Sequence, residues 1–231
     1  MLPEIVRAAA SNFENKTVIE CENNISLSYK DLDIISDEVA GALAKRGLPE
    51  GSIILLSLPT SIEYLITYIA ASKIGLITAG VNPRLKAPER KSICEIAEPD
   101  LVIATSELLD GIPTDISTEI IEPADDKEKL LIELRSDSFQ PEKLEENLNR
   151  PVCICFTSGS TGTPKGALFT NKELLAIQKM DTEGVWGSGG HLIPSTAFAH
   201  VGSMTKLPWQ LSKGVTLHVL DRWKAEKVIE L

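Results

Sequence analysis

The sequence predicts an α/β fold, a mostly parallel sheet with helices on both of its faces, and two patterns support this. Strand-length apolar runs recur at Ser52–Leu58, Leu76–Val81 and Leu101–Thr105. Nearly continuous apolar runs of this length are typical of strands that are buried on both faces. Helical patterns lie between these runs, and the alternation of strand, helix and strand predicts parallel pairing with right-handed crossovers.

The helices are predicted from their start and stop signals. Ser28, with Asp31 three residues later, forms a capping box ahead of apolar residues at helical spacing, and Gly47 is a natural stop. Ser61 can cap a second helix that ends at Gly75. Helices are also expected over 2–13, over 88–98, over 171–180 with Asn171 as the cap, within 196–211, and from Asp221 onward.

The remaining strands are shorter or lie later in the chain. Thr17–Cys21 and Ile25–Leu27 predict a hairpin around Asn23 and Asn24, because asparagine tolerates the positive φ of a tight turn. Val152–Phe156 has the pattern of a buried strand. Short strands are also expected over 119–121, 167–169 and 215–219.

The stretch from Ser106 to Arg150 has the weakest pattern. Ten acidic and only four basic residues fall within Glu119–Glu146, which indicates a solvated surface connection with one or two short helices. The apolar residues expected to hold it to the core are Leu130, Leu131, Ile132 and Leu134. We therefore divide the chain into a first α/β subdomain, 1–150, and a segment, 151–231, that begins a further α/β region.

Composition limits the classes of function. The net charge is −10 and the pI is near 4.9, which argues against nucleic acid as a partner. The four cysteines form no Cys-x-x-Cys pair and lie at no zinc-site spacing from a histidine, so we expect buried, reduced thiols and no metal ligands. No signal-peptide pattern opens the chain, and its most apolar region, 53–81, is interrupted before the roughly 20 apolar residues of a membrane helix. A cytoplasmic protein without a transmembrane segment is therefore expected.

One stretch, Phe156–Gly166, differs from the rest in its chemistry. It reads Phe-Thr-Ser-Gly-Ser-Thr-Gly-Thr-Pro-Lys-Gly and follows a predicted buried strand. Its glycines allow successive backbone amides to face one anion, its five hydroxyl side chains add donors, and Lys165 adds a positive charge. The stretch therefore predicts a polyphosphate-binding loop at a strand end.

Two other interpretations of this loop are weaker. A Walker-type P-loop needs Gly, four residues and then Gly-Lys-Ser/Thr. Here Pro164 stands where the second glycine would, and Gly166 follows the lysine. A flexible Ser/Gly/Thr surface loop is the common outcome for short tracts of this composition. The buried strand before the loop and its Pro-Lys-Gly ending argue against that outcome.

Three other segments accompany the loop in a particular order. They are Leu27-Ser-Tyr-Lys-Asp-Leu32, then Ala71-Ser-Lys-Ile-Gly-Leu76 with Val81-Asn-Pro-Arg84, and finally Pro194-Ser-Thr-Ala-Phe-Ala-His-Val-Gly202. Together with the loop, they resemble the adenylate-forming (AMP-binding) superfamily of acyl- and aryl-CoA synthetases, luciferases and peptide-synthetase adenylation domains. The resemblance runs over essentially the whole chain and implies the N-terminal part of that superfamily's large domain.

The resemblance implies an ATP-dependent acid–thiol ligase. In such an enzyme a fatty or aryl carboxylate attacks the α-phosphate of Mg-ATP, and the thiol of CoA or of a carrier protein then takes the acyl group. ATP, Mg²⁺ and coenzyme A are the implied cofactors and co-substrates. The implied phosphate-binding residues are Thr157, Ser158, Gly159, Ser160, Thr161, Gly162, Thr163 and Lys165.

The same resemblance implies that Lys165 and His200 are the catalytic residues. His200 matches the family position that carries a histidine or an aromatic residue at the mouth of the acyl pocket, near the substrate carboxylate and the α-phosphate. The stretch 200–207 would supply part of the pocket wall. By contrast, His191 and His218 are expected to be structural, and Arg84 is expected to be a surface or salt-bridge residue.

Other parts of the family's active site would follow Leu231. They are the adenine- and magnesium-binding segment, a ribose-binding Asp, a hinge, and a C-terminal domain with a catalytic Lys. Because the last predicted helix stops at Leu231 without a capping signal, we expect these 231 residues to be an N-terminal fragment that is inactive alone.

Two alternative functions remain open at this point. An amino-acid-activating domain of a peptide synthetase usually carries Phe-Asp where this chain has Phe198-Ala-His-Val-Gly202, so the acyl branch is favoured. A non-catalytic nucleotide-binding module belongs to another class of protein. Against it stands the apolar sheet edge that such a module would expose.

Overall fold

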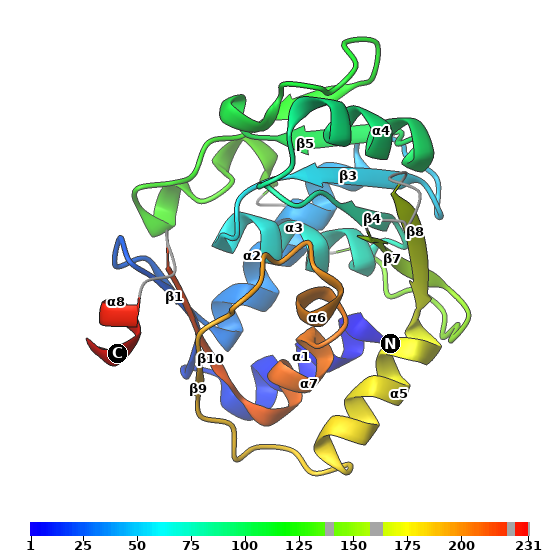
Figure 1. The fold of residues 1–231 in the computed structure, drawn as a ribbon. Helices are drawn as coiled ribbons and strands as arrows, with labels where there is room; N and C mark the ends of the chain where they lie inside the picture. Colours follow the sequence, from blue (N-terminus) through cyan, green and yellow to red (C-terminus); the bar gives the residue numbers. More distant parts are fainter. Residues whose placement is uncertain (137–140, 158–163, 221–224, 231) are drawn as a thin grey trace.

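The computed structural model describes residues 1–136, 141–157, 164–220 and 225–230. These residues form two sheets with helices packed against them (Figure 1). The larger sheet has the strand order β6 (Thr118–Ile120), β5 (Leu101–Ala104), β3 (Ile53–Ser57), β4 (Ile77–Gly80), β7 (Pro151–Thr157) and β8 (Lys165–Thr170). All of its neighbouring strands are parallel except β7 and β8. The predicted α/β class and the mostly parallel sheet are confirmed.

Helices cover both faces of this sheet, as predicted. The described α-helices are α1 (Leu2–Phe13), α2 (Tyr29–Ala44), α3 (Ile62–Lys73), α4 (Ala87–Ala97), α5 (Asn171–Thr182), α6 (Val201–Met204), α7 (Leu207–Lys213) and α8 (Ala225–Glu230). On one face Ile54 and Leu56 join a core with α1, α2 and α3, whereas Leu55 packs on the other face with Ile93 of α4. Alternate residues of one strand thus point to two separate cores, which explains its continuous apolar run.

The second sheet was not predicted from the sequence. Its order is β2 (Ser26–Ser28), β1 (Thr17–Cys21), β10 (Thr216–Val219) and β9 (His191–Leu192). The predicted hairpin over 17–27 exists as β1 and β2, and β1 then pairs in parallel with β10. The hydroxyl of buried Tyr29 donates to the carbonyl oxygen of Val215, 2.7 Å away, and so fastens the start of α2 to β10.

Two predicted caps are confirmed and a third is wrong by one residue. The Ser61 side chain accepts from the Tyr64 amide at the start of α3. The side chain of Ser28 accepts from the Asp31 amide, and the Asp31 carboxylate accepts from the Ser28 amide, as a capping box requires. Burial acts to raise the pKa of Asp31, but hydrogen bonds from Lys127 and Ser28 outweigh it and lower that pKa. For α5 the cap is Thr170, which shares a capping box with Glu173. Asn171 is instead the first helical residue, and its buried side chain accepts from the Leu2 amide.

The acidic connection lies on the surface, and three of the four apolar residues predicted to hold it to the core are buried. It contains β6 and two short 3-10 helices, Lys127–Lys129 and Ile132–Leu134. Leu130, Leu131 and Leu134 are buried, but Ile132 is 64% exposed, so its predicted role as an anchor is wrong. Ile132 is the first residue of the second 3-10 helix, and its side chain faces solvent.

The histidines and cysteines expected to be structural have structural contacts. His191 Nδ1 and His218 Nε2 are 2.7 Å apart across β9 and β10. Cys94, Cys153 and Cys155 are buried as expected, whereas Cys21 is only partly buried. Burial raises the pKa of Cys94 to about 11. Among the described residues, no helix combines the length and the apolar character needed to cross a membrane. The division at residue 150 stays a proposal, since both sheets take strands from either side of it.

Candidate active site

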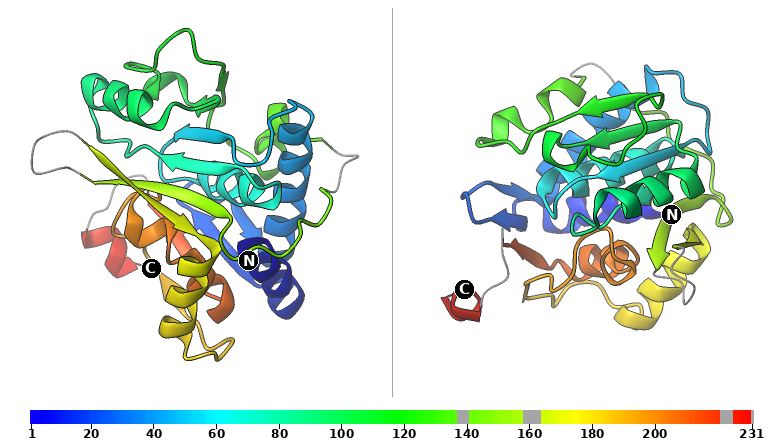
Figure 2. Two further views of the ribbon diagram at one scale, coloured as in Figure 1. Left: turned by 90° about the vertical axis from the view of Figure 1, so that its right-hand side faces the viewer. Right: turned by 45° about the horizontal axis from the view of Figure 1, so that its top comes forward.

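The predicted phosphate loop connects the two strands of an antiparallel hairpin. Thr157 at the end of β7 lies opposite Lys165 at the start of β8, and the Thr157 hydroxyl donates to the Lys165 carbonyl oxygen at 3.5 Å. Figure 2 shows the two strands side by side, extending from the edge of the larger sheet. The loop residues between them, Ser158, Gly159, Ser160, Thr161, Gly162 and Thr163, lie outside the described residues.

The hairpin leaves the Lys165 ammonium available. Lys165 is exposed, and within the described residues no carboxylate pairs with it. Next to it, Gly166 needs to be a glycine, because a Cβ atom there would lie 2.8 Å from Ile154 Cγ2 on the paired strand. A free cation beside the strand end is what an incoming polyphosphate requires.

This hairpin starts at the edge of the sheet where other strands also end. β3, β4, β5 and β7 are parallel, so their carboxyl ends share one edge. A cavity of about 720 Å³ lies there, lined by residues that follow those strands, such as Thr60, Arg84 and Glu107. In open α/β sheets, ligands bind outside the carboxyl ends of the strands. The position of this cavity is therefore that of a ligand site.

Arg84 is a surface residue that also lines this cavity. It is exposed, as expected, and among the described residues its guanidinium has no ion-pair partner, so it lines the cavity without a salt bridge. One sequence signal could have indicated that Arg84 lies at the cavity. The Asn82-Pro83 pair directly follows a buried strand and precedes Arg84. A strand end places the next few residues at the ligand edge of the sheet.

His200 caps a short helix and has a defined tautomer. Its Nδ1 accepts a hydrogen bond from the Gly202 amide at 3.0 Å, at the start of α6. Because Nδ1 accepts this hydrogen bond, the neutral ring carries its proton on Nε2. The ring is exposed, so its Nε2–H is free to donate to an oxygen of a ligand.

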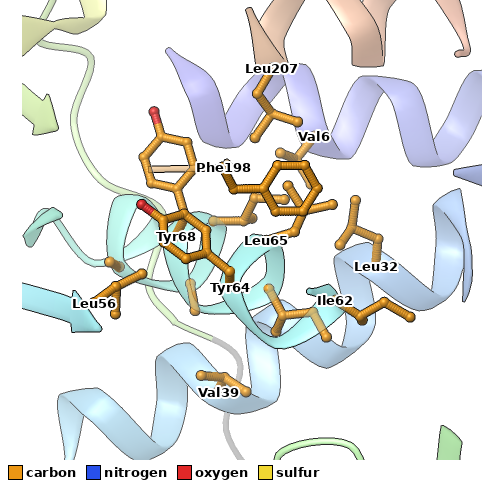
Figure 3. Close-up of a cluster of buried hydrophobic side chains, with 14 of the residues drawn as sticks. Val6, Leu32, Val39, Leu56, Ile62, Tyr64, Leu65, Tyr68, Phe198 and Leu207 are labelled. Carbon is orange, nitrogen blue, oxygen red and sulfur yellow. The ribbon is translucent and has the colours of Figure 1, made fainter. Parts of the chain in front are cut away.

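Buried contacts hold the His200 segment on the sheet. Met204 Sδ lies 3.4 Å from the Tyr64 hydroxyl and 3.8 Å from Cys155 Sγ on β7, and the Tyr68 hydroxyl donates to the Met204 carbonyl oxygen at 3.2 Å. Tyr64 also packs against Phe198, with ring centroids 6.0 Å apart (Figure 3). Cys155 precedes Thr157 by two residues. The strand that leads into the phosphate loop therefore also supports the His200 segment.

A methyl group at Gly80 should disturb this arrangement. A Cβ atom there would lie 2.5 Å from the Tyr64 hydroxyl oxygen, 3.0 Å from Met204 Sδ and 3.1 Å from the Ala199 Cα. We expect Gly80→Ala to destabilise the fold by about 1–3 kcal/mol, the usual cost of overpacking. Urea unfolding measures this. Gly190→Ala is the control, since its Cβ would meet nothing within 4 Å. Equal midpoints for the two variants would contradict the packing described here.

A second cavity, of about 390 Å³, lies on the other side of the Pro194–Thr196 segment. That segment contributes to the walls of both cavities. Gly202 and Ser203 of α6 line the second cavity, as does Lys206. The two cavities thus share one wall, and the His200 segment follows that wall directly in the chain.

Magnesium ligands were not predicted in this chain. Within the part of the chain that the structure describes, no three His, Cys, Asp or Glu side chains are grouped so that they could hold a metal ion.

The mostly parallel sheet and the helices around it match the N-terminal domain of adenylate-forming enzymes. The chain belongs to the AMP-binding enzyme family, whose model matches residues 6–231. It is 26% identical over 223 residues to the long-chain-fatty-acid–CoA ligase FadD13 of Mycobacterium tuberculosis, covering 92% of this chain and 43% of that protein. It is 29% identical over 168 residues to the 4-coumarate–CoA ligase of Vanilla planifolia, covering 68% of this chain and 30% of that protein.

Solved structures show the same fold. The N-terminal domain of FACL13 from Mycobacterium tuberculosis matches with a TM-score of 0.84 at 23% identity, over 99% of this chain and 59% of that one. The fatty acyl CoA synthetase of Mycobacterium tuberculosis matches with a TM-score of 0.82 at 23% identity, over 99% of this chain and 46% of that one. The chain thus spans less than half the length of the curated relatives it matches.

Proposed function

We propose that this chain provides the phosphate-binding part of a ligase that activates a fatty or aryl carboxylic acid with ATP and passes the acyl group to a thiol. The observation that carries the proposal is the family match over 6–231, together with the exposed Lys165 of the β7–β8 hairpin, which has no ion pair with any residue that the structure describes. CoA is the favoured acceptor, because the relatives named above are acid–CoA ligases.

In the first step the acid's carboxylate oxygen attacks the α-phosphorus of ATP, and the bond to the bridging oxygen of pyrophosphate breaks. Negative charge grows on the departing pyrophosphate. Lys165 and Thr157, with the hydroxyls of 158–163, are proposed to bind that group. Donors fixed before the reaction stabilise developing charge without a reorganisation cost.

In the same step His200 is proposed to hold the acid. Its Nε2–H donates to a carboxylate oxygen, which orients the other oxygen toward the α-phosphorus. In the second step a thiol attacks the acyl carbon, the bond between that carbon and the phosphate oxygen breaks, and AMP leaves. The thiol proton passes to solvent.

Acid-dependent exchange of labelled pyrophosphate into ATP tests the proposal, with the polypeptide at its native length. Exchange should require a carboxylic acid. The 231-residue chain by itself should support none, because it spans 43% of FadD13. Exchange driven by amino acids alone would favour a peptide-synthetase function. ATP binding without exchange for any acid would contradict both ligase functions and favour a nucleotide-binding module.

A further inference from the structure

Two histidines and a glutamate form a row across the second sheet. Glu20 of β1 pairs with His218 of β10, and His191 of β9 pairs with Thr216, two residues before His218. Because alternate residues of a strand point to one face, these side chains lie on the same face of the sheet. His191 Nδ1 lies 2.7 Å from His218 Nε2, and His218 Nδ1 lies 3.6 Å from a Glu20 carboxylate oxygen. The row thus brings three titratable groups together, and none of them lines either cavity.

The contact between the two rings requires a proton between them. One nitrogen must donate and the other must accept, because neither two bare nitrogens nor two N–H groups can form a hydrogen bond. The contact is compatible with a neutral pair and with a pair that carries one added proton. When both rings are charged, all four ring nitrogens carry protons, and two N–H groups face each other. The contact is then repulsive.

The charged groups around the pair can balance one added proton and not two. Within the described residues, Glu20 supplies the one carboxylate that has an ion-pair contact with either ring. The Lys16 ammonium donates to the Gly189 carbonyl oxygen at 3.2 Å and adds positive charge beside the segment that leads into β9. From α7, the carbonyl oxygen of Lys213 accepts from the Gly189 amide at 2.7 Å. A second charge on the pair would therefore meet no second carboxylate.

Few contacts hold β9 to the sheet. It has only two residues, and in the described sheet it lies at the edge and pairs with β10 alone. The Thr216 amide donates to the carbonyl oxygen of Gly190, the residue before β9, at 2.9 Å. Edge segments with so few contacts open at a small cost in free energy. One residue after β9 the chain enters Pro194–Thr196, the wall that the two cavities share.

We propose that the His191–His218 pair is a pH-sensitive contact, which opens β9 from β10 when both rings are charged and so frees the wall that the two cavities share. The direction follows from the number of protons. The closed pair holds at most one added proton and the open pair holds two, so a fall in pH favours the open form. At neutral pH the pair is not repulsive, and the backbone bonds of Gly189 and Gly190 hold the segment. The contact therefore acts only in acid.

Hydrogen exchange of the Thr216 amide tests this, with the polypeptide at its native length and without ATP or acid substrate. A free imidazole titrates near pH 6.5, and each further pH unit favours the form with the extra proton about 10-fold. The protection factor of the Thr216 amide should therefore fall about 10-fold between about pH 7 and about pH 5.5. The Val81 amide, which donates to Leu56 in the larger sheet, should keep its protection.

Two histidine substitutions make the assignment sharper. His191→Ala removes the facing ring, so the Thr216 protection factor should no longer fall over this pH range. His200→Ala is the matched control, because it removes the one histidine of the chain that lies outside the pair, and it should keep the native response. As a second measurement, NMR of the ¹⁵N-labelled native protein should show a scalar coupling between the two facing nitrogens at neutral pH and none in acid.

Three results would overturn the inference. In the first, Thr216 protection in the native protein does not change with pH. In the second, His191→Ala keeps the native response or His200→Ala loses it. In the third, the Thr216 and Val81 amides lose protection equally, which is the behaviour of a domain that unfolds as a whole in acid. All three leave the proposed function untouched, since the measurement does not involve the ligase reaction.

Discussion

Lys165→Ala should lower the rate of pyrophosphate exchange by about 10²- to 10³-fold, the loss found when one preorganised donor to developing charge is removed. The structure gives the reason. Lys165 begins β8 opposite Thr157, is exposed, and has no ion pair within the described residues. Its ammonium is therefore free for the departing pyrophosphate. The KM for the acid should change little, since the acid binds elsewhere. Initial rates over a range of ATP and acid concentrations measure both effects.

His200→Ala should give the opposite pattern. Loss of the Nε2–H donor removes a hydrogen bond to a charged carboxylate, so the KM for the acid should rise by about 10-fold or more while the KM for pyrophosphate stays near the native value. His191→Ala is the matched control, because that ring contacts His218 and is not among the residues that line either cavity. Small and equal effects of Lys165→Ala and His200→Ala would contradict the two assigned roles.

Lys73→Met should destabilise the fold by about 3–5 kcal/mol, the cost of breaking a buried ion pair by removing one partner. The Lys73 side chain is 0% exposed and lies 2.5 Å from Asp33 and 2.6 Å from Asp37, both on α2. Its ammonium also donates to the Asp33 carbonyl oxygen at 2.9 Å. Without the lysine, two partly buried carboxylates would face each other. Because domains are stable by only about 5–15 kcal/mol, this loss is severe.

Chemical unfolding of the variants measures this effect. Lys91→Met removes a surface pair with Glu95, in which both side chains are 61% exposed, and should cost at most about 0.5 kcal/mol. Should Lys73→Met prove insoluble, Asp37→Asn keeps the lysine and one carboxylate and should cost less than the full loss. A Lys73→Met variant as stable as Lys91→Met would refute a structural role for the α2–α3 ion pairs.

The elements of the larger sheet could be predicted because their signals are local. A buried strand such as β3 is a continuous apolar run, and the Ser28 and Ser61 caps precede the helices they begin. The Thr170 cap also had a local signal, the Glu173 three residues later, although Asn171 looked equally suitable. Where two neighbouring residues can both cap, only the path of the backbone decides between them.

The second sheet and the buried lysine could not be predicted, since both depend on distant parts of the chain. β1 pairs with β10 about 200 residues later, and no pattern within either strand specifies that partner. Lys73 interrupts an apolar stretch in the sequence, but its two carboxylate partners lie on another helix. The second cavity likewise depends on distant segments, since Asp181 of α5 and Lys206, just before α7, both line it.

The central claim is that the acid's own oxygen forms a bond to the α-phosphorus of ATP. Transfer of ¹⁸O from a labelled acid tests this most directly, in a complete reaction with CoA and the polypeptide at its native length. One labelled oxygen should appear in AMP, because the thiol displaces AMP together with the oxygen that attacked phosphorus. Label in inorganic phosphate with ADP as the other product, or AMP without label, would contradict the account.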